Sequence, residues 1–262
     1  MAARVVGPLR AALLGVEAQW TWYRRNWRAT AITNFLQPVL FLLAMGLGFG
    51  SQVRPGEATG GAPYAVFLAP ALLVLTAVQN AMFESTYAVF SAFKWQKTYL
   101  GVVATPITPA QILYGRLLWI VLRLLSGAVV FLGVATALGA VTSAGAVWGV
   151  PAAVLAGMAF SAPVVAFTAT REKPEAFNGL YRFVLVPMML FAGAFFPLDQ
   201  LPAWLHPLAW LTPVWHGVEL ARGAAFGTLG PAAALGHVAY LAALVAVGVL
   251  LGRKYFQRRL AV

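Results

Sequence analysis

The chain has 262 residues, of which 61% are hydrophobic and only 10% are charged, with a net charge of +11. Soluble domains average about 45–50% apolar and about 25% charged residues, so this composition excludes a soluble fold and indicates an integral membrane protein. We expect no nucleic acid partner, because the positive charge follows the membrane topology described below, and the absence of cysteine excludes disulfides and cysteine-based metal sites.

Residues 1–28 are too polar to span a bilayer, although leucine and tryptophan recur among the basic residues. The arginines are Arg4, Arg10, Arg24, Arg25 and Arg28, and the large apolar residues include Leu9, Leu13, Leu14, Trp20 and Trp27. This pattern is typical of an amphipathic helix that lies in the membrane interface, with its basic groups toward the lipid headgroups. The alternative is a basic leader that only orients the first span.

Six apolar runs follow, each near the ~20 residues that a helix needs to cross a bilayer. They cover about residues 32–49, 64–93, 113–138, 147–168, 177–196 and 232–251. The second run is longer than a bilayer requires, so we expect its last turns to project from the membrane. The chain is therefore predicted to be an all-α polytopic membrane protein, with a single transmembrane domain over residues 1–262.

The stretch 197–227, between the fifth and sixth runs, is apolar but broken. Four prolines lie within residues 197–213, and no ordinary helix continues through them, because each removes a backbone donor and crowds the preceding turn. Its tryptophans and leucines make it too apolar for a solvated loop. We predict a re-entrant helical hairpin, with the candidate residues Pro197, Leu201, Trp204, Trp210, Pro213, Trp215 and Glu219.

Lysine and arginine are distributed unevenly over the predicted loops. Of 18 such residues, five lie in the first 28 residues, three in the loop after the second run, three in residues 171–182 and four after residue 252. The loops of the opposite side hold only Arg54 and Arg222. Because cytoplasmic loops carry the excess of lysine and arginine, we expect both termini in the cytoplasm and the hairpin on the outer face.

The sequence offers little for catalysis. The three histidines, His206, His216 and His237, have no carboxylate pair at metal-ligand spacing, and no serine lies in a G-x-S-x-G context. None of the four lysines follows a glycine, so the phosphate-binding loop G-x-x-x-x-G-K-[ST] is absent. We therefore expect no catalytic residue, metal or cofactor in this chain, and a motor driven by nucleotide must lie on another chain.

Glu84 and Arg123 lie inside apolar runs, where ionisable side chains are costly and are usually paired or functional. Counted at ~1.5 Å per residue, both lie about 14 Å from the same membrane boundary. Because the two runs are consecutive, we predict an ion pair between them that fixes packing. The alternative is that the projecting end of the second run leaves Glu84 close to water.

In the loop after the second run we predict a short amphipathic helix with the residues Lys94, Trp95, Gln96, Lys97, Thr98, Tyr99 and Leu100. Trp95 and Tyr99, at i and i+4, would share one helical face. The following Thr105-Pro106-Ile107-Thr108-Pro109 stops the helix. We predict that this segment docks a cytoplasmic partner, although a plain positively charged loop remains an alternative.

These motifs resemble a known family. Glu84 to Phe90, the segment from Lys94 and the run from Leu100 to Ala110 resemble the type-2 permeases of ABC transporters. Phe191 to Leu205 and Pro213 to Gly223 look like the outer signature of the same family. The resemblance covers nearly the whole chain and is greatest to the permeases that export lipo-oligosaccharide nodulation factors and related drug-efflux substrates.

The resemblance implies an exporter in the cytoplasmic (inner) membrane of a bacterium. Two permease chains, expected to be a homodimer, would form one path for an amphipathic lipo-oligosaccharide, glycolipid or drug. Two copies of a separate ATP-binding subunit would bind the ATP and magnesium. The segment from Lys94 to Leu100 would be the coupling helix, with Arg171, Glu172 and Lys173 as a second contact. The outer hairpin would be the exit for cargo or a passive plug.

Two other classes fit the sequence less well. A membrane enzyme would need a cluster of acids, histidines or metal ligands near one face, and the seven acidic residues are scattered. An ion-coupled carrier or channel without an ATPase partner usually places several polar groups at mid-membrane, whereas Glu84 and Arg123 are nearly alone. An adjacent reading frame with an ATP-binding loop would favour the exporter over both.

Overall fold

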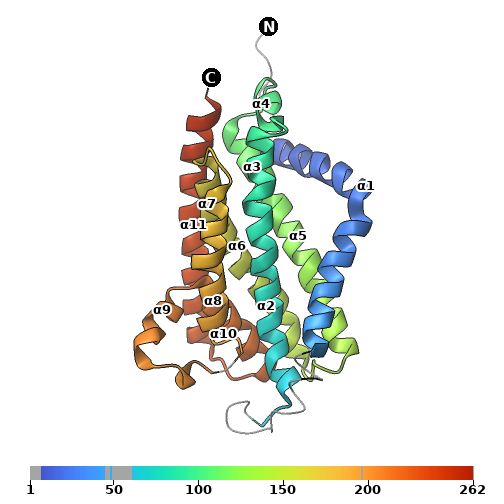
Figure 1. Ribbon diagram of the computed structural model, residues 1–262, viewed down its shortest axis with the longest axis vertical. Coiled ribbons are helices and arrows are strands. Elements are labelled where there is room, and N and C mark those ends of the chain that lie inside the picture. The colour runs from blue at the N-terminus through green and yellow to red at the C-terminus, as the bar shows by residue number, and fades with distance from the viewer. Residues whose placement is uncertain (1–6, 45–47, 49–60, 196, 262) are drawn as a thin grey trace.

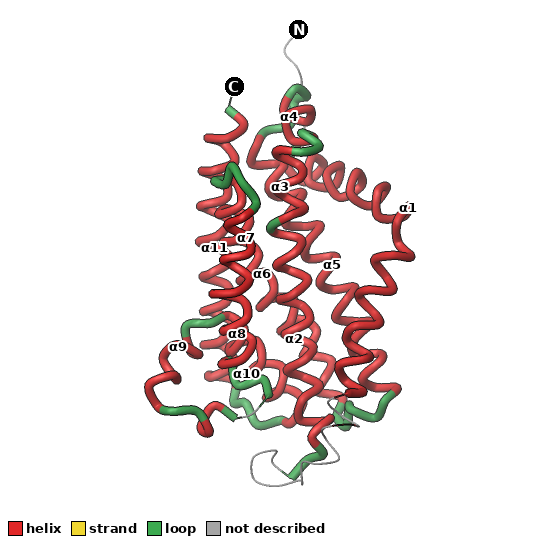
Figure 2. Tube along the Cα trace, in the orientation of Figure 1, coloured by secondary structure: helices red, strands yellow, loops and turns green. Residues whose placement is uncertain are grey.

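The computed structural model describes residues 7–44, 48, 61–195 and 197–261, and every regular element in these ranges is helical. Figures 1 and 2 show long helices that run along one axis and are joined by short loops. The helices are α1 Pro8–Leu43, α2 Tyr64–Ser85, α3 Tyr87–Lys94, α4 Thr98–Val103, α5 Pro109–Ala137, α6 Gly149–Ala169, α7 Glu175–Leu180, α8 Val186–Phe191, α9 His206–Trp210, α10 Pro213–Phe226 and α11 Pro231–Leu260. The all-α prediction is therefore confirmed for the described residues.

Among the described residues, four helical runs are long and apolar enough to cross a membrane. They are Tyr64–Lys94, Pro109–Ala137, Ala144–Ala169 and Pro231–Leu260. These four correspond to the second, third, fourth and sixth predicted spans. Each is longer than the ~20 residues that a bilayer requires, so part of each extends beyond the apolar layer.

The predicted interface helix and first span belong to one helix, α1. Figure 1 shows α1 bending, so that its first part crosses the end of the bundle near α3 and its second part runs beside α5. The end of the predicted span, toward residue 49, lies outside the described residues. Leu9, Leu13 and Trp20 are exposed on the first part, as expected for a helix that meets lipid at an interface.

The fifth predicted span is a helical run interrupted by a wider turn. It consists of α7, a π-helical turn Tyr181–Leu185 and α8. Pro187 cannot donate a backbone hydrogen bond to the preceding turn, and the π turn lies directly before it. The helix ends at Phe191 rather than near residue 196, because Gly193 adopts the left-handed conformation with φ 70°.

The centre of the bundle is α6, which packs against α11, α2, α10 and α5. Its sequence is rich in alanine and glycine, and such small residues allow membrane helices to approach closely. The closest approach is at Gly248 of α11, where a Cβ atom would lie 2.4 Å from the nitrogen of Pro163 and 2.5 Å from the carbonyl carbon of Ala162. The backbones of α6 and α11 therefore touch at this point.

The two ends of the bundle contain different segments. α1 begins and α11 ends at the end that carries α4, whereas α9 and α10 lie at the opposite end (Figure 1). The segments predicted to be cytoplasmic and those predicted to be outside are thus separated along the axis.

We predict that Gly248→Ala destabilises the protein by about 1–3 kcal/mol, because the added methyl group meets backbone atoms that cannot move aside. The midpoint of thermal unfolding (Tm) in detergent should fall. Gly236→Ala, in the same helix with nothing within 4 Å of the new methyl group, is the matched control and should leave the Tm unchanged or slightly raised. Equal Tm values for the two variants would contradict the close contact.

Candidate functional site

The chain between α3 and α5 forms the tip of one end of the bundle (Figure 1). Lys94 is the last residue of α3, residues 95–97 form a turn, and α4 begins only at Thr98. The prediction of one helix from Lys94 to Leu100 is therefore wrong. Lys97 adopts the left-handed conformation with φ 53°, which is costly for a residue with a Cβ atom, and it separates the two helices.

The predicted common face of Trp95 and Tyr99 is also wrong, because the i, i+4 relation holds only within one continuous helix. Trp95 is 60% exposed and packs edge-on against Phe90. Tyr99 is buried, with its ring against Phe93 and Phe256. The side chains of this segment that remain exposed are Trp95, Gln96, Lys97, Thr98 and Leu100.

α5 begins with a capping box that the sequence reading missed. The hydroxyl of Thr108 accepts a hydrogen bond from the backbone N–H of Gln111, and Oε1 of Gln111 accepts one from the N–H of Thr108 at 2.8 Å. This reciprocal arrangement satisfies two free donors at a helix start. The helix therefore begins at Pro109, before the third apolar run starts near residue 113, and both contain Arg116.

The second predicted contact, residues 171–173, is held by ion pairs of Glu172. The carboxylate of Glu172 bonds Lys94 at the end of α3 and lies 3.3 Å from Nη2 of Arg259 in α11. The hydrogen bond from Lys94 holds the pKa of Glu172 below its ordinary value. The contact is therefore complete above the ordinary glutamate pKa of about 4.3 and is lost as the pH falls through the lowered one.

Arg259 strengthens the same end of the bundle. Its Nη1 donates to the carbonyl oxygens of Thr168 and Ala169, at 3.1 and 2.7 Å, and so caps the C-terminus of α6. Its guanidinium also lies over the ring of Phe93, 4.5 Å from the centroid. α3, α6 and α11 are thereby held together beneath the exposed turn at Trp95.

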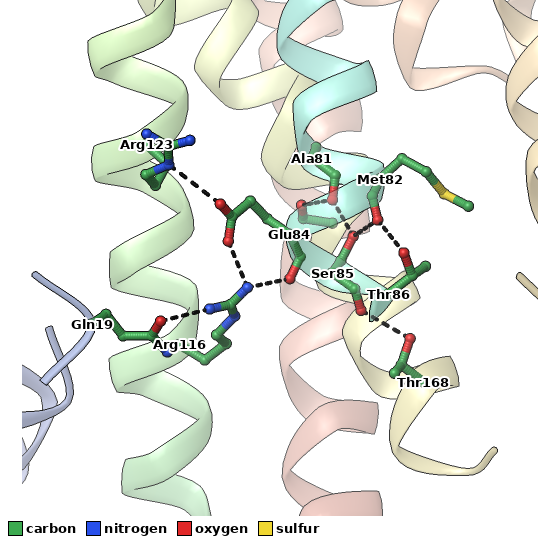
Figure 3. A network of polar contacts seen from close by, with 10 residues as sticks. Gln19, Ala81, Met82, Glu84, Ser85, Thr86, Arg116, Arg123 and Thr168 are labelled. Atoms are coloured by element: carbon green, nitrogen blue, oxygen red, sulfur yellow. Dashed lines mark hydrogen bonds and ion pairs between the residues drawn. The ribbon is translucent and has the colours of Figure 1, made fainter. Parts of the chain in front are cut away.

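Glu84 is the centre of a buried ionic network (Figure 3). Its Oε1 lies 3.3 Å from Nε of Arg123, the partner suggested by the sequence, and its Oε2 lies 2.6 Å from Nη2 of Arg116. Nη2 of Arg116 also donates to the carbonyl oxygen of Glu84. The side chains are only 13%, 12% and 3% exposed, in the order Glu84, Arg123 and Arg116, so the charges interact through a medium of low dielectric constant.

The first part of α1 joins this network. Nη1 of Arg116 donates to Oε1 of Gln19 at 3.1 Å, and the ring of Tyr23 stacks on the guanidinium of Arg123, 4.5 Å from its centroid. The sequence reading missed Arg116 as a partner because it was counted with the loop charges. The signal was available: Arg116 and Arg123 are seven residues apart, so they lie on the same face of a helix.

Beside Glu84, the helical run from Tyr64 to Lys94 is interrupted at Thr86, which we call the joint between α2 and α3. α2 ends at Ser85 and α3 begins at Tyr87, because Thr86 between them has φ −102° and ψ −89°. The hydroxyls of Ser85 and Thr86 donate back to the carbonyls of Ala81 and Met82, a bond that bends helices. Thr168 of α6 donates to the carbonyl of Ser85 at 2.9 Å (Figure 3), so the joint is fixed to the central helix.

At the opposite end, stretch 197–227 consists of short helical segments and one longer helix, α10. Short 3₁₀ turns at Leu198–Gln200 and Ala203–Leu205 precede α9, and α10 runs from Pro213 to Phe226. Thr212 caps α10 by accepting from the N–H of Trp215, and Gly227 ends it with φ 67°. Trp204 and Trp210 are exposed, whereas Pro197, Leu201, Trp215 and Glu219 are half-buried and Pro213 is buried.

α10 is fastened to its neighbours by two polar contacts. Nδ1 of His216 lies 2.8 Å from Nδ1 of His237 in α11, and its Nε2 lies 2.9 Å from the carbonyl oxygen of Trp210. Arg222 donates to the carbonyls of Gly193 and Ala194 at the bend after α8. These histidines have a packing role, and among the described residues no group of three or more His, Cys, Asp or Glu could hold a metal ion.

A cavity of about 180 Å³ lies between α1, α2, α5 and the run from α7 to α8. Its lining is mostly apolar, including Phe41, Phe131 and Leu190, and it contains the polar side chains of Thr76 and Gln79 from α2. Thr76 and Gln79 are three residues apart, so they lie on the same face of α2, and Gln79 also donates to the sulfur of Met189 in α8.

Comparison with known proteins gives one family and several relatives. The family described as ABC-2 type transporter matches residues 12–226. The chain is 30% identical to Nodulation protein J of Sinorhizobium fredii over 92% of this chain and 94% of the relative, and 29% identical to Nodulation protein J of Rhizobium leguminosarum bv. viciae over 97% and 98%. It is 23% identical to the inner membrane transport permease YadH of Escherichia coli over 79% and 78%.

We predict that Glu84→Gln destabilises the protein by about 3–5 kcal/mol, because it leaves two buried guanidinium groups without a counter-charge. Arg123→Gln should cost much less, since Glu84 keeps Arg116. The combined change Glu84→Arg with Arg123→Glu should not restore stability, because the new guanidinium at position 84 would lie against Arg116.

Thermal unfolding in detergent measures these effects: the Tm should fall most for Glu84→Gln and much less for Arg123→Gln. Glu175→Gln, which removes an exposed carboxylate from α7, is the control for the loss of one negative charge. A Tm for Glu84→Gln equal to that of Glu175→Gln would show that the network does not stabilise the bundle.

Proposed function

Because the chain belongs to the ABC-2 type transporter family, we propose that it exports an amphipathic lipo-oligosaccharide or a related glycolipid or drug, driven by two copies of a separate ATP-binding subunit. The chain is a multi-pass membrane permease subunit, and its sequence has no phosphate-binding loop of its own. The cargo class is supported by the similarity to Nodulation protein J of two rhizobia over more than nine-tenths of the chain.

We place the α4 end of the bundle in the cytoplasm, with both termini, and the α9–α10 end outside. The second part of α1 and the run from α7 to α8 complete six spans in this arrangement. The asymmetry of lysine and arginine between the loops supports it, as does the separation of these loops along the bundle axis (Figure 1). Two such chains form the translocation path as a homodimer.

The observation that carries the coupling proposal is the exposed turn at Trp95. An exposed tryptophan at the tip of the cytoplasmic end is a strong anchor for a protein partner, and here it follows α3 directly. α3 meets α2 at Thr86, next to the Glu84 network that joins α2, α5 and α1. A movement of this turn, caused by the ATP-binding subunits, would therefore displace α2, α5 and α1 together as a rigid body.

For the cargo, the cavity lined by Thr76 and Gln79 of α2 offers a binding place that suits an amphipathic molecule. Thr76 and Gln79 can hydrogen-bond sugar hydroxyls, while the apolar walls accept an acyl chain. At the outer end, exposed Trp204 and Trp210 lie where such a molecule would enter the outer leaflet. A passive plug formed by α9 and α10 is the competing role for this hairpin.

The cargo proposal is tested by reconstituting the permease in proteoliposomes with its ATP-binding subunit. A lipo-oligosaccharide should raise the rate of ATP hydrolysis and accumulate on the side of the permease's outer face, whereas the acyl chain or the oligosaccharide alone should not. Stimulation by neither the intact molecule nor an amphipathic drug would reject this cargo class.

We predict that Trp95→Ala separates ATP hydrolysis from export. Membrane insertion and Tm should stay near those of the unchanged protein, because Trp95 is 60% exposed, while binding of the ATP-binding subunit weakens by about 2 kcal/mol or more. Pull-down, ATPase and transport assays measure the three effects. Trp148→Ala, which removes a tryptophan that is 70% exposed at the opposite end, is the control. Normal export by Trp95→Ala would contradict the docking role of Trp95.

A further inference from the structure

The Glu84 network contains more positive than negative charge. One carboxylate faces two guanidinium groups, and Gln19, which completes the set, is uncharged. Arg116 is fully engaged at its ends, because Nη1 bonds Gln19 and Nη2 bonds Glu84. The surplus positive charge therefore belongs to Arg123, which makes a single bond to Glu84 through Nε.

One edge of the Arg123 guanidinium, formed by its two terminal nitrogens, does not bond Glu84. Figure 3 shows these two nitrogens pointing away from Glu84, and within the described part of the chain neither donates a hydrogen bond. Tyr23 covers the face of the guanidinium, 4.5 Å from the ring centroid, so the free positions lie in the plane of the group. That planar pair of donors matches two oxygens of a phosphate.

The residues next to Arg123 are exposed, so this edge of the guanidinium lies near the outer surface of the bundle. Leu122 is 42% exposed, and Ser126, one turn further along α5, is also exposed. Asn80 of α2 places its amide against Gly127, 3.6 Å from the position of a Cβ atom there, which adds a second polar donor one turn beyond Arg123. Arg24 and Arg25 follow Tyr23 on α1 and are exposed, so further positive charge lies beside this surface.

The level of the site along the bundle fits a lipid headgroup. The first part of α1, which exposes Leu9, Leu13 and Trp20, crosses α5 where Gly15 lies against Gly115 and Tyr23 against Trp119. A helix of this kind lies in the interface between headgroups and acyl chains. The contact of α1 at Trp119 lies only four residues from Arg123, closer than the boundary near residue 113 from which the depth of about 14 Å was counted. An arginine side chain can extend over this shorter distance toward the interface.

We propose that Arg123, supported by Asn80 and oriented by Tyr23 and Glu84, binds the phosphate of an anionic phospholipid in the inner leaflet. The inference rests on the orientation proposed above, in which the α4 end is cytoplasmic. The bound phosphate would neutralise the surplus charge of the network and tie α1 to α5, so that the lipid becomes part of the contact between these helices.

The test uses the purified permease in detergent, without ATPase or cargo, so its outcome does not depend on whether the export proposal is correct. Phosphatidylglycerol, phosphatidylcholine and inorganic phosphate are added separately, and the Tm is measured against concentration. Phosphatidylglycerol should raise the Tm of the unchanged protein in a saturable way, as a ligand of the folded state does. The other two should have little effect.

Arg123→Gln should abolish the rise with phosphatidylglycerol while leaving the Tm in pure detergent close to that of the unchanged protein, because Glu84 keeps Arg116. Arg253→Gln, which removes an exposed positive charge from α11, should respond like the unchanged protein. Arg123→Lys keeps the charge but loses the planar fork, so its affinity for the lipid, measured by native mass spectrometry, should fall on the order of tenfold.

Four results would overturn the proposal. The first is an equal rise of Tm in Arg123→Gln and the unchanged protein, and the second is no rise in either. The third is an equal rise with inorganic phosphate at the same concentration, which would assign the site to a soluble anion instead of a lipid. An equal response to phosphatidylcholine would likewise reject recognition of a net negative headgroup.

Discussion

The packing of the helices depends on the pairing of one buried negative charge, the carboxylate of Glu84. A charge among apolar helices is costly unless it is paired and hydrogen-bonded, and here the pairing needs two arginines from α5 and, through them, Gln19 and Tyr23 from α1. The bonds are directional, so they fix the rotation and height of three helices relative to one another. Apolar packing alone would specify these less strictly, because lipid tails compete equally for apolar surfaces.

Much of the architecture is predictable from the sequence because membrane helices have strong signals. Long apolar runs, proline clusters and charged loops mark the helices and separate the two ends of the bundle. The proximity of Glu84 and Arg123 follows from counting residues to a common boundary. Arg116 escaped this reasoning because it was counted with the charges of the preceding loop, although it lies within both the third apolar run and α5.

Other features depend on conformations that the pattern of residues does not encode. Trp95 and Tyr99 have helical spacing, yet Lys97 adopts a left-handed conformation that lysine rarely takes, and the two rings therefore point to different environments. The burial of Tyr99 against Phe256 joins residues far apart in the chain, and no local pattern indicates it. Similarly, the basic leader and the first span share the helix α1, because nothing in the intervening residues forces the backbone to break.

The joint at Thr86 has a mechanical consequence. α3 has eight residues, so it forms an arm about 12 Å long between the joint and Trp95. If α2 and α3 turned as one rigid body about Thr86, a tilt of about 10° would displace the tip by about 2 Å, whereas Glu84, two residues beyond the pivot, would move by only about 0.5 Å. In such a movement a large displacement at the exposed turn would become a small displacement at the buried charges.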